Sequence, residues 1–147
     1  MKTITKIQAV EQEDLVNLFS SALYGNSYMG VDYPTDFYRQ HCDVNENDCI
    51  EDKLAKVLLA GGKISVIDME AEDETDHFGK LEAKFDRCGM EYKVSLADIT
   101  KGIEKALDHG GYENKCAKYL IYTPEDLDLE EGYSLLQFIV FGEIVYG

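Results

Sequence analysis

Hydrophobic residues recur at the spacing of a helix in three parts of the chain, 11–23, 48–60 and 95–107. The first part has acids in its first turn, where they suit the helix dipole. The other two begin with the pattern of a capping box, with Asp48 and Ser95 as the N-caps. Glycines follow all three parts, as is typical of helix ends. The pattern therefore predicts helices over these ranges.

Alternation of apolar and polar residues predicts strands over 63–71 and 90–96. We expect these two strands to pair as an antiparallel hairpin, joined by a long, charged connection over 72–89 whose tip is mobile. Looser alternation over 2–10 indicates a first strand. Residues 117–122 fit either a short strand or the end of a helix.

The C-terminal segment from Leu135 to Tyr146 is apolar on both faces when it is arranged as a strand. Such a strand lies in the middle of a sheet, covered on two sides. Glu143 interrupts the second face, and it would need a partner or a route to water if it were buried. The sequence therefore predicts a single α+β domain over 1–147. Its four- or five-stranded sheet, mixed or antiparallel, has a central C-terminal strand and two or three packed helices.

The composition is that of a folded globular protein. Hydrophobic residues make up 45% of the 147 positions, and ten tyrosines and six phenylalanines are among them. No apolar run approaches the roughly 20 residues that span a bilayer. Residues 1–6 lack the apolar region of a signal peptide. We therefore expect a soluble protein of the cytoplasm.

The acidic residues are grouped along the chain. Of the 29 acids, 16 lie in three runs that contain no Lys or Arg, and the formal net charge is −15. The first run, 43–52, contains Asp43, Glu46, Asp48, Glu51 and Asp52. The second, 68–76, contains Asp68, Glu70, Glu72, Asp73, Glu74 and Asp76. The third, 125–131, contains Glu125, Asp126, Asp128, Glu130 and Glu131.

This charge pattern favours a basic protein surface as partner, such as a groove that normally holds DNA or RNA. Nucleic acids and anionic membranes are bound through clustered Lys and Arg, which this chain lacks. Acids two apart on a strand or four apart on a helix are separated by about 6–7 Å, close to successive phosphates of one nucleic-acid strand. The runs could therefore imitate a phosphate backbone. The alternative is an acidic coat that only prevents aggregation.

A stretch rich in tyrosine, 24–38, contains two candidate anchors for a partner, Tyr28 and Tyr33. Tyrosine is common at interfaces because it offers apolar area and a polar tip. The alternative is a half-buried loop packed on the sheet. Pro34-Thr35-Asp36 predicts a turn into a short helical piece.

Two weak metal-binding patterns are present. His41, Cys42 and Cys49, completed by His77, Cys88 or Cys116, could hold a structural zinc ion, although their spacing differs from common zinc motifs. The acids of run 68–76 could hold Mg²⁺ or Ca²⁺, with Asp68, Glu70 and Glu72 on one side of a strand. Ordinary reduced thiols and a solvated acidic surface are the simpler interpretations.

No catalytic motif accompanies the acids. The phosphate-binding, nucleophile-elbow and zinc-protease patterns are all missing from the sequence. We therefore expect a binding protein that has no catalytic, cofactor-binding or metal-binding residues. A protein that sequesters a nucleotide signal is a further alternative, but its anionic ligand would require the few bases to converge.

Three pieces of the sequence resemble small acidic phage and mobile-element proteins of uncharacterised function. They are 15–29, 61–72 and the closing Phe141-Gly142-Glu143-Ile144-Val145-Tyr146-Gly147. Together they cover roughly a quarter of the chain, whereas residues 31–60 differ from that group. The resemblance brings no catalytic residues. It implies a role in countering host defence, as inhibitors of restriction enzymes and CRISPR effectors do.

These observations give one leading hypothesis. The chain is an anti-defence, anti-CRISPR-like DNA mimic that acts in the cytoplasm of the host cell by occupying the basic surface of a nucleic-acid-handling nuclease. The predicted contact residues are Asp68, Glu70, Glu72, Asp73, Glu74, Asp76, Glu125, Asp126, Asp128, Glu130, Glu131, Tyr28 and Tyr33. A zinc-stabilised or divalent-metal-dependent domain is the alternative from another class.

Overall fold

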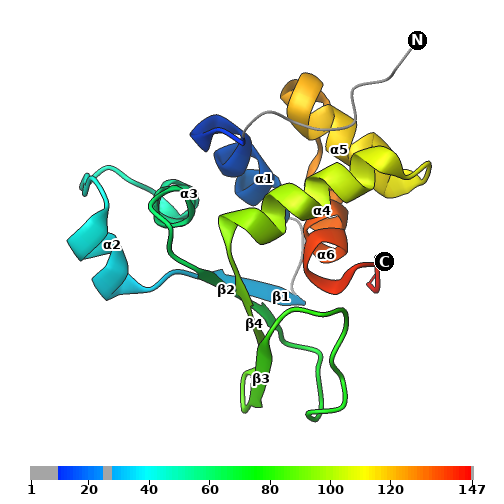
Figure 1. The fold of residues 1–147 in the computed structure, drawn as a ribbon, viewed down its shortest axis with the longest axis horizontal. Coiled ribbons are helices and arrows are strands. Elements are labelled where there is room, and N and C mark those ends of the chain that lie inside the picture. Colours follow the sequence, from blue (N-terminus) through cyan, green and yellow to red (C-terminus); the bar gives the residue numbers. More distant parts are fainter. Residues whose placement is uncertain (1–9, 25–27, 147) are drawn as a thin grey trace.

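A computed structural model describes residues 10–24 and 28–146 and has an α+β fold (Figure 1). The helices are α1 (Gln12–Tyr24), α2 (Thr35–His41), α3 (Ile50–Leu59), α4 (Leu96–Asp108), α5 (Tyr112–Tyr122), a 3-10 turn η1 (Pro124–Asp126) and α6 (Leu129–Phe141). The strands are β1 (Met29–Asp32), β2 (Ile64–Asp68), β3 (Ala83–Asp86) and β4 (Gly89–Val94). They form one antiparallel sheet in the order β1-β2-β4-β3.

The sheet has one covered face. Ile64, Val66 and Asp68 alternate along β2 and are fully buried, and their partners on β4 include Tyr92, opposite Val66. The other face is polar: the Ser65 hydroxyl and the Lys93 ammonium both contact the Glu91 carboxylate. Asp68 is therefore a carboxylate at the end of an otherwise apolar, inward-facing row.

The C-terminal apolar segment is a helix, so the prediction of a central C-terminal strand is wrong. Every residue of α6 from Glu131 to Phe141 is buried, because the helix is packed between α1, α4 and α5. A helix that is apolar all round belongs in a core, and a short apolar run does not distinguish it from a buried strand. Gly142 ends the helix in the left-handed conformation, with a φ of 79°. Glu143 follows the helix and is exposed.

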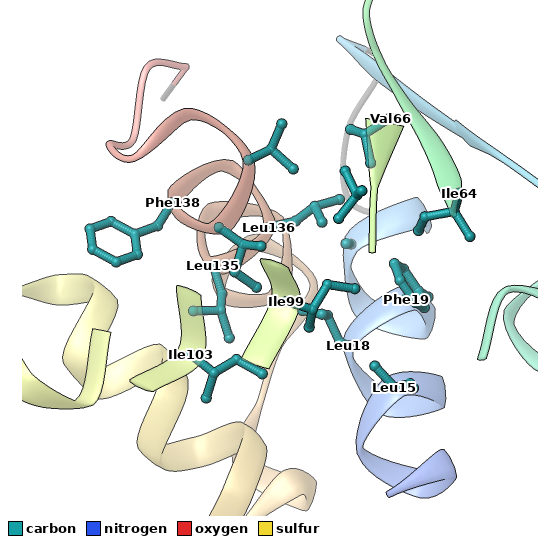
Figure 2. Packing of buried hydrophobic residues seen from close by; sticks show 14 of the residues in the cluster. Leu15, Leu18, Phe19, Ile64, Val66, Ile99, Ile103, Leu135, Leu136 and Phe138 are labelled. Atoms are coloured by element: carbon teal, nitrogen blue, oxygen red, sulfur yellow. The ribbon is translucent and has the colours of Figure 1, made fainter. Parts of the chain in front are cut away.

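The closest helix contact lies between α6 and α1. A Cβ atom added to Gly132 would lie 2.2 Å from the Cβ of Ser21, so the missing side chain lets the two backbones approach. Figure 2 shows Leu135 and Leu136 of α6 directed toward Leu18 and Ile99, while Phe138 lies on the side away from Phe19 and Ile64. The core thus forms around α6, and the sheet lies at its C-terminal end.

The structure confirms some of the other predicted helices and strands and corrects the rest. The helices over 11–23 and 95–107 and the antiparallel pairing of 63–71 with 90–96 are confirmed, and so is the short helical piece after Pro34. The pair is not a simple hairpin, because β3 lies within the predicted connection and pairs with the outer edge of β4. Residues 117–122 belong to α5. The described residues form six α-helices, more than the two or three predicted.

Two sequence expectations concern segments that lie wholly or mostly outside the described residues: the strand over 2–10, of which the structure describes Val10 alone, and the glycine that follows the first helix, Gly25. Among the helices that the structure describes, none is long and apolar enough to cross a membrane.

Candidate protein-binding surface

The second acidic run forms a loop that begins where β2 ends. We call residues 69–76 the acidic loop. Asp68, just before it, is fully buried, and both of its carboxylate oxygens accept the Tyr146 hydroxyl at 2.8 Å. The same carboxylate accepts the backbone N–H of Glu70 at 3.0 Å. Asp68 therefore links the start of the loop to the C-terminal segment through hydrogen bonds. Because its side chain is fully buried, it is not available as the partner contact that the sequence predicted.

The C-terminal segment is itself held by α6. The side chain of Gln137, fully buried, donates to the carbonyl of Tyr146 and accepts the N–H groups of Val145 and Tyr146. Burial, followed by the hydrogen bond to the Asp68 carboxylate, raises the pKa of Tyr146 far above its ordinary value. Tyr28 stacks on the Tyr146 ring, with centroids 5.6 Å apart. The phenol at the base of the loop is therefore a neutral donor.

Residues that follow the acidic loop attach it to the core. The N–H of Phe78 donates to the Tyr92 hydroxyl at 2.9 Å. The Phe78 ring packs against the Phe141 ring, with the ring centroids 5.4 Å apart. Gly79 has a φ of +74°, and a Cβ there would lie 2.8 Å from the Phe141 carbonyl oxygen. Both ends of the acidic loop are thus fixed near the C-terminal end of α6 (Figure 1).

Inside the loop, two aspartates bond to the backbone. Asp76 accepts the N–H of Glu72 at 2.7 Å, and Asp73 accepts the N–H of Thr75 at 2.8 Å together with its hydroxyl. The hydroxyl, followed by the N–H, lowers the pKa of Asp73. The expectation of a mobile tip stays a prediction, but these bonds give the tip a defined turn.

The three glutamates of the loop project into solvent. Glu70, Glu72 and Glu74 are exposed, and none has an ion pair with another described residue. Tyr28 and Met69 beside them are 39% and 44% exposed. The loop therefore presents fixed negative charge next to two apolar side chains of types that are enriched at interfaces.

The acids do not follow the spacing of a strand. Because β2 ends at Asp68, Glu70 and Glu72 lie in a turn, so the predicted alignment of Asp68, Glu70 and Glu72 on one side of a strand is wrong. The strand-based match to phosphate spacing is lost with it. Any imitation of a nucleic acid must rest on the local cluster of charges around the loop.

The third acidic run has a different role, at the N-terminus of α6. Asp128 is the N-cap and accepts the N–H of Glu131 at 2.7 Å, while Glu131 accepts the N–H of Asp128 at 3.0 Å. Glu131 is only 6% exposed and lies 3.4 Å from the Lys115 ammonium. Glu125, Asp126 and Glu130 remain exposed.

The first run also serves mainly to build structure. The helix cap is Cys49, bonded to Asp52, and not the predicted Asp48. Asp48 instead accepts Lys56 at 2.7 Å and the Tyr38 hydroxyl at 2.6 Å, and Lys56 makes the larger contribution to lowering its pKa. Glu51 is buried and accepts hydrogen bonds from α1.

The acidic runs do not converge on one face. Run 125–131 lies at the N-terminal end of α6 and the acidic loop at its C-terminal end. The thirteen residues of α6, each rising 1.5 Å along the helix axis, place the two acidic segments about 20 Å apart. The separation follows from a C-terminal helix in place of the predicted C-terminal strand, because this helix lies between the two acidic segments.

The two predicted tyrosine anchors are also separated. Tyr28 precedes β1 at the Asp68 end of the sheet, whereas Tyr33 follows β1 at the opposite end. Tyr33 is half-buried, contacts the Tyr38 ring edge-on at 5.7 Å and lies beneath the Lys53 ammonium. Only Tyr28 therefore belongs with the acidic loop.

Among the described residues, no group of three or more His, Cys, Asp and Glu is placed to hold a metal ion. His41 packs on the Phe37 ring, and the Cys49 thiol donates to Asp52. Cys116 is buried in α5, and burial raises its pKa to about 12. The zinc hypothesis stays a prediction.

Sequence reasoning missed Met69, which no charge pattern marks. It also assigned no site to Lys101 and Lys105, although their spacing of four places them on one face of α4. That spacing was the available signal for a cationic site.

Comparison of the chain with protein-family models, curated proteins and solved structures found no match. The resemblance to phage proteins therefore stays a prediction.

Proposed function

We propose that the protein binds a basic, nucleic-acid-binding surface of another protein through the acidic loop and thereby inhibits it. The observation that carries this proposal is the exposure of Glu70, Glu72 and Glu74 on a loop fixed at both ends. Fixed charges lose less conformational freedom on binding than charges on an unstructured tail. Tyr28 and Met69 would add apolar contact at the edge.

The partner class follows from charge complementarity. A cluster of exposed glutamates that form no ion pair with the described residues fits a surface rich in Lys and Arg, which nucleases use to hold DNA or RNA. The resemblance to phage proteins suggests a host defence nuclease, either a restriction enzyme or an RNA-guided one. Binding should weaken as salt concentration rises.

The test is inhibition of DNA cleavage by a panel of purified restriction and RNA-guided nucleases. Two charge-matched triple variants supply the comparison: E70K/E72K/E74K in the acidic loop and E125K/D126K/E130K around η1. Each changes the net charge by six units, from −15 to −9.

Inhibition should be lost in the first variant and largely kept in the second. Equal loss in both variants would show that only bulk charge matters. Inhibition that survives the first variant would contradict the proposal.

A further inference from the structure

A cavity of about 310 Å³ opens between α4, the last turn of α6 and the segment that follows the acidic loop. Its apolar wall includes Leu81, Phe138 and Ile139. Its volume lies at the lower end of the range of about 300–1,000 Å³ that small-molecule sites occupy. The cavity can thus take a ligand about as large as one nucleotide.

Three lysines line this cavity: Lys80, Lys101 and Lys105. The chain has 14 bases, of which Lys2 and Lys6 lie outside the described residues. A quarter of the described bases therefore meet at one cavity of an acidic protein. Asp98 is the acid that shares the lining, and its carboxylate is held by the N–H and hydroxyl of Ser95 in the α4 cap.

The three ammonium groups have no polar partner among the described residues. None forms an ion pair with a described acid or donates a hydrogen bond to a described residue. Lys105 lies over the Phe138 ring at 6.0 Å. Lys101 and Lys105 lie four positions apart on α4 and therefore share one face of the helix.

A structural role for these lysines is to offset the negative C-terminal end of α6, which has no base in its last turn. Among the described residues, however, no α6 carbonyl accepts a hydrogen bond from any of the three lysines. The charge therefore remains available to an external anion.

We propose that the cavity binds a nucleoside monophosphate, with its phosphate between Lys101, Lys105 and Lys80 and its base against the apolar wall. A phosphate monoester carries about −1.5 to −2 charges at neutral pH, which matches three ammonium groups better than a carboxylate does. The base of a nucleotide would contact the apolar wall, which inorganic phosphate alone would leave without a contact. This site is separate from the acidic loop and from the function proposed for it.

Calorimetric titration of the four nucleoside monophosphates into the protein, at physiological salt to screen its overall negative field, tests the proposal. Inorganic phosphate probes the phosphate half of the ligand, and adenosine probes the half that carries the base. K101Q/K105Q removes the paired charges, and K63Q/K84Q is the control, since both of its lysines are exposed and lie outside the cavity lining. L81W fills the cavity, and circular dichroism checks that it folds.

At least one nucleotide should bind saturably at a single site. Affinity should fall about tenfold or more in K101Q/K105Q, as expected for lost charged hydrogen bonds, and stay within about twofold in the control. L81W should abolish binding. The proposal is overturned if no nucleotide binds at about 1 mM, if the control loses as much affinity, or if phosphate alone binds as tightly.

Discussion

The acidic loop and run 125–131 each contain five acids, and in each some acids build structure while others face solvent, but the exposed acids of the loop lie beside the exposed Tyr28 and Met69. At the N-terminus of α6, Asp128 and Glu131 satisfy each other's backbone N–H groups. Buried Asp68, just before the acidic loop, and the turn-forming Asp73 and Asp76 within it position three glutamates whose side chains have no hydrogen bond or ion pair with another described residue. Acids that build structure and acids left for a partner therefore differ in their contacts, which composition does not reveal.

The largest expected effect concerns the base of the acidic loop. Tyr146→Phe leaves the fully buried Asp68 carboxylate without its phenol donor, and removing one partner of a buried charge costs about 3 kcal/mol. Urea unfolding measures the change in the free energy of unfolding. Tyr133→Phe is the control, because the buried Tyr133 hydroxyl has no hydrogen-bond partner among the described residues and its removal should cost less than about 0.5 kcal/mol. Equal costs for the two variants would contradict the role of Tyr146.

The next effect concerns the other end of α6. Asp128→Ala removes the N-cap and should lower the free energy of unfolding by about 1 kcal/mol. Glu125→Ala, in the same run but without a capping hydrogen bond, should change it by less than about 0.5 kcal/mol. Thermal unfolding of both variants measures the difference. If Glu125→Ala proves the more damaging, the structural role assigned to the cap is wrong.

Sequence patterns predicted parts of this comparison. The Asp-x-x-Glu pattern of a capping box occurs at Asp128 and Glu131, where it does cap α6. The same pattern at Asp48 predicts the cap of α3 one residue before the true cap, Cys49. The apolar run through Leu135 to Phe141 was assigned to a strand because its composition fits both structures. The helix is favoured by burial against three other helices, which is a property of the whole fold.

The site was less predictable than the fold. Charge alone marks the run 68–76, but the burial of Asp68 at the end of β2 involves a hydrogen bond to Tyr146, 78 positions away. No local pattern separates a buried aspartate from the exposed glutamates that follow it. The lysines around the cavity come from α4 and from the segment after the loop, and only folding brings them together.

A smaller effect should follow from reversing the charges of the acidic loop. E70K/E72K/E74K should keep the free energy of unfolding within about 0.5 kcal/mol of the wild-type value, because the three side chains are exposed and unpaired. Chemical denaturation measures this. A loss of several times that amount would mean that the glutamates stabilise the fold, which would remove the distinction between the two regions.

The smallest effect is local and depends on pH. Asp73 has a pKa below its ordinary 3.8, so its bond to Thr75 stabilises the loop above that pH and is lost as the pH falls through the folded-state value. The NMR shift of the Thr75 amide should therefore be constant near neutrality and change below about pH 4. Asp73→Asn should lack this titration, and a wild-type amide that does not respond would contradict the turn.

The central claim is that a partner contacts the acidic loop and not run 125–131. Hydrogen exchange of the protein, free and bound to a nuclease that it inhibits, tests this without any substitution. The account predicts slower exchange of amides in 69–76 and at Tyr28 in the complex, with exchange in 125–131 unchanged. Protection confined to 125–131, with the acidic loop unaffected, would contradict it.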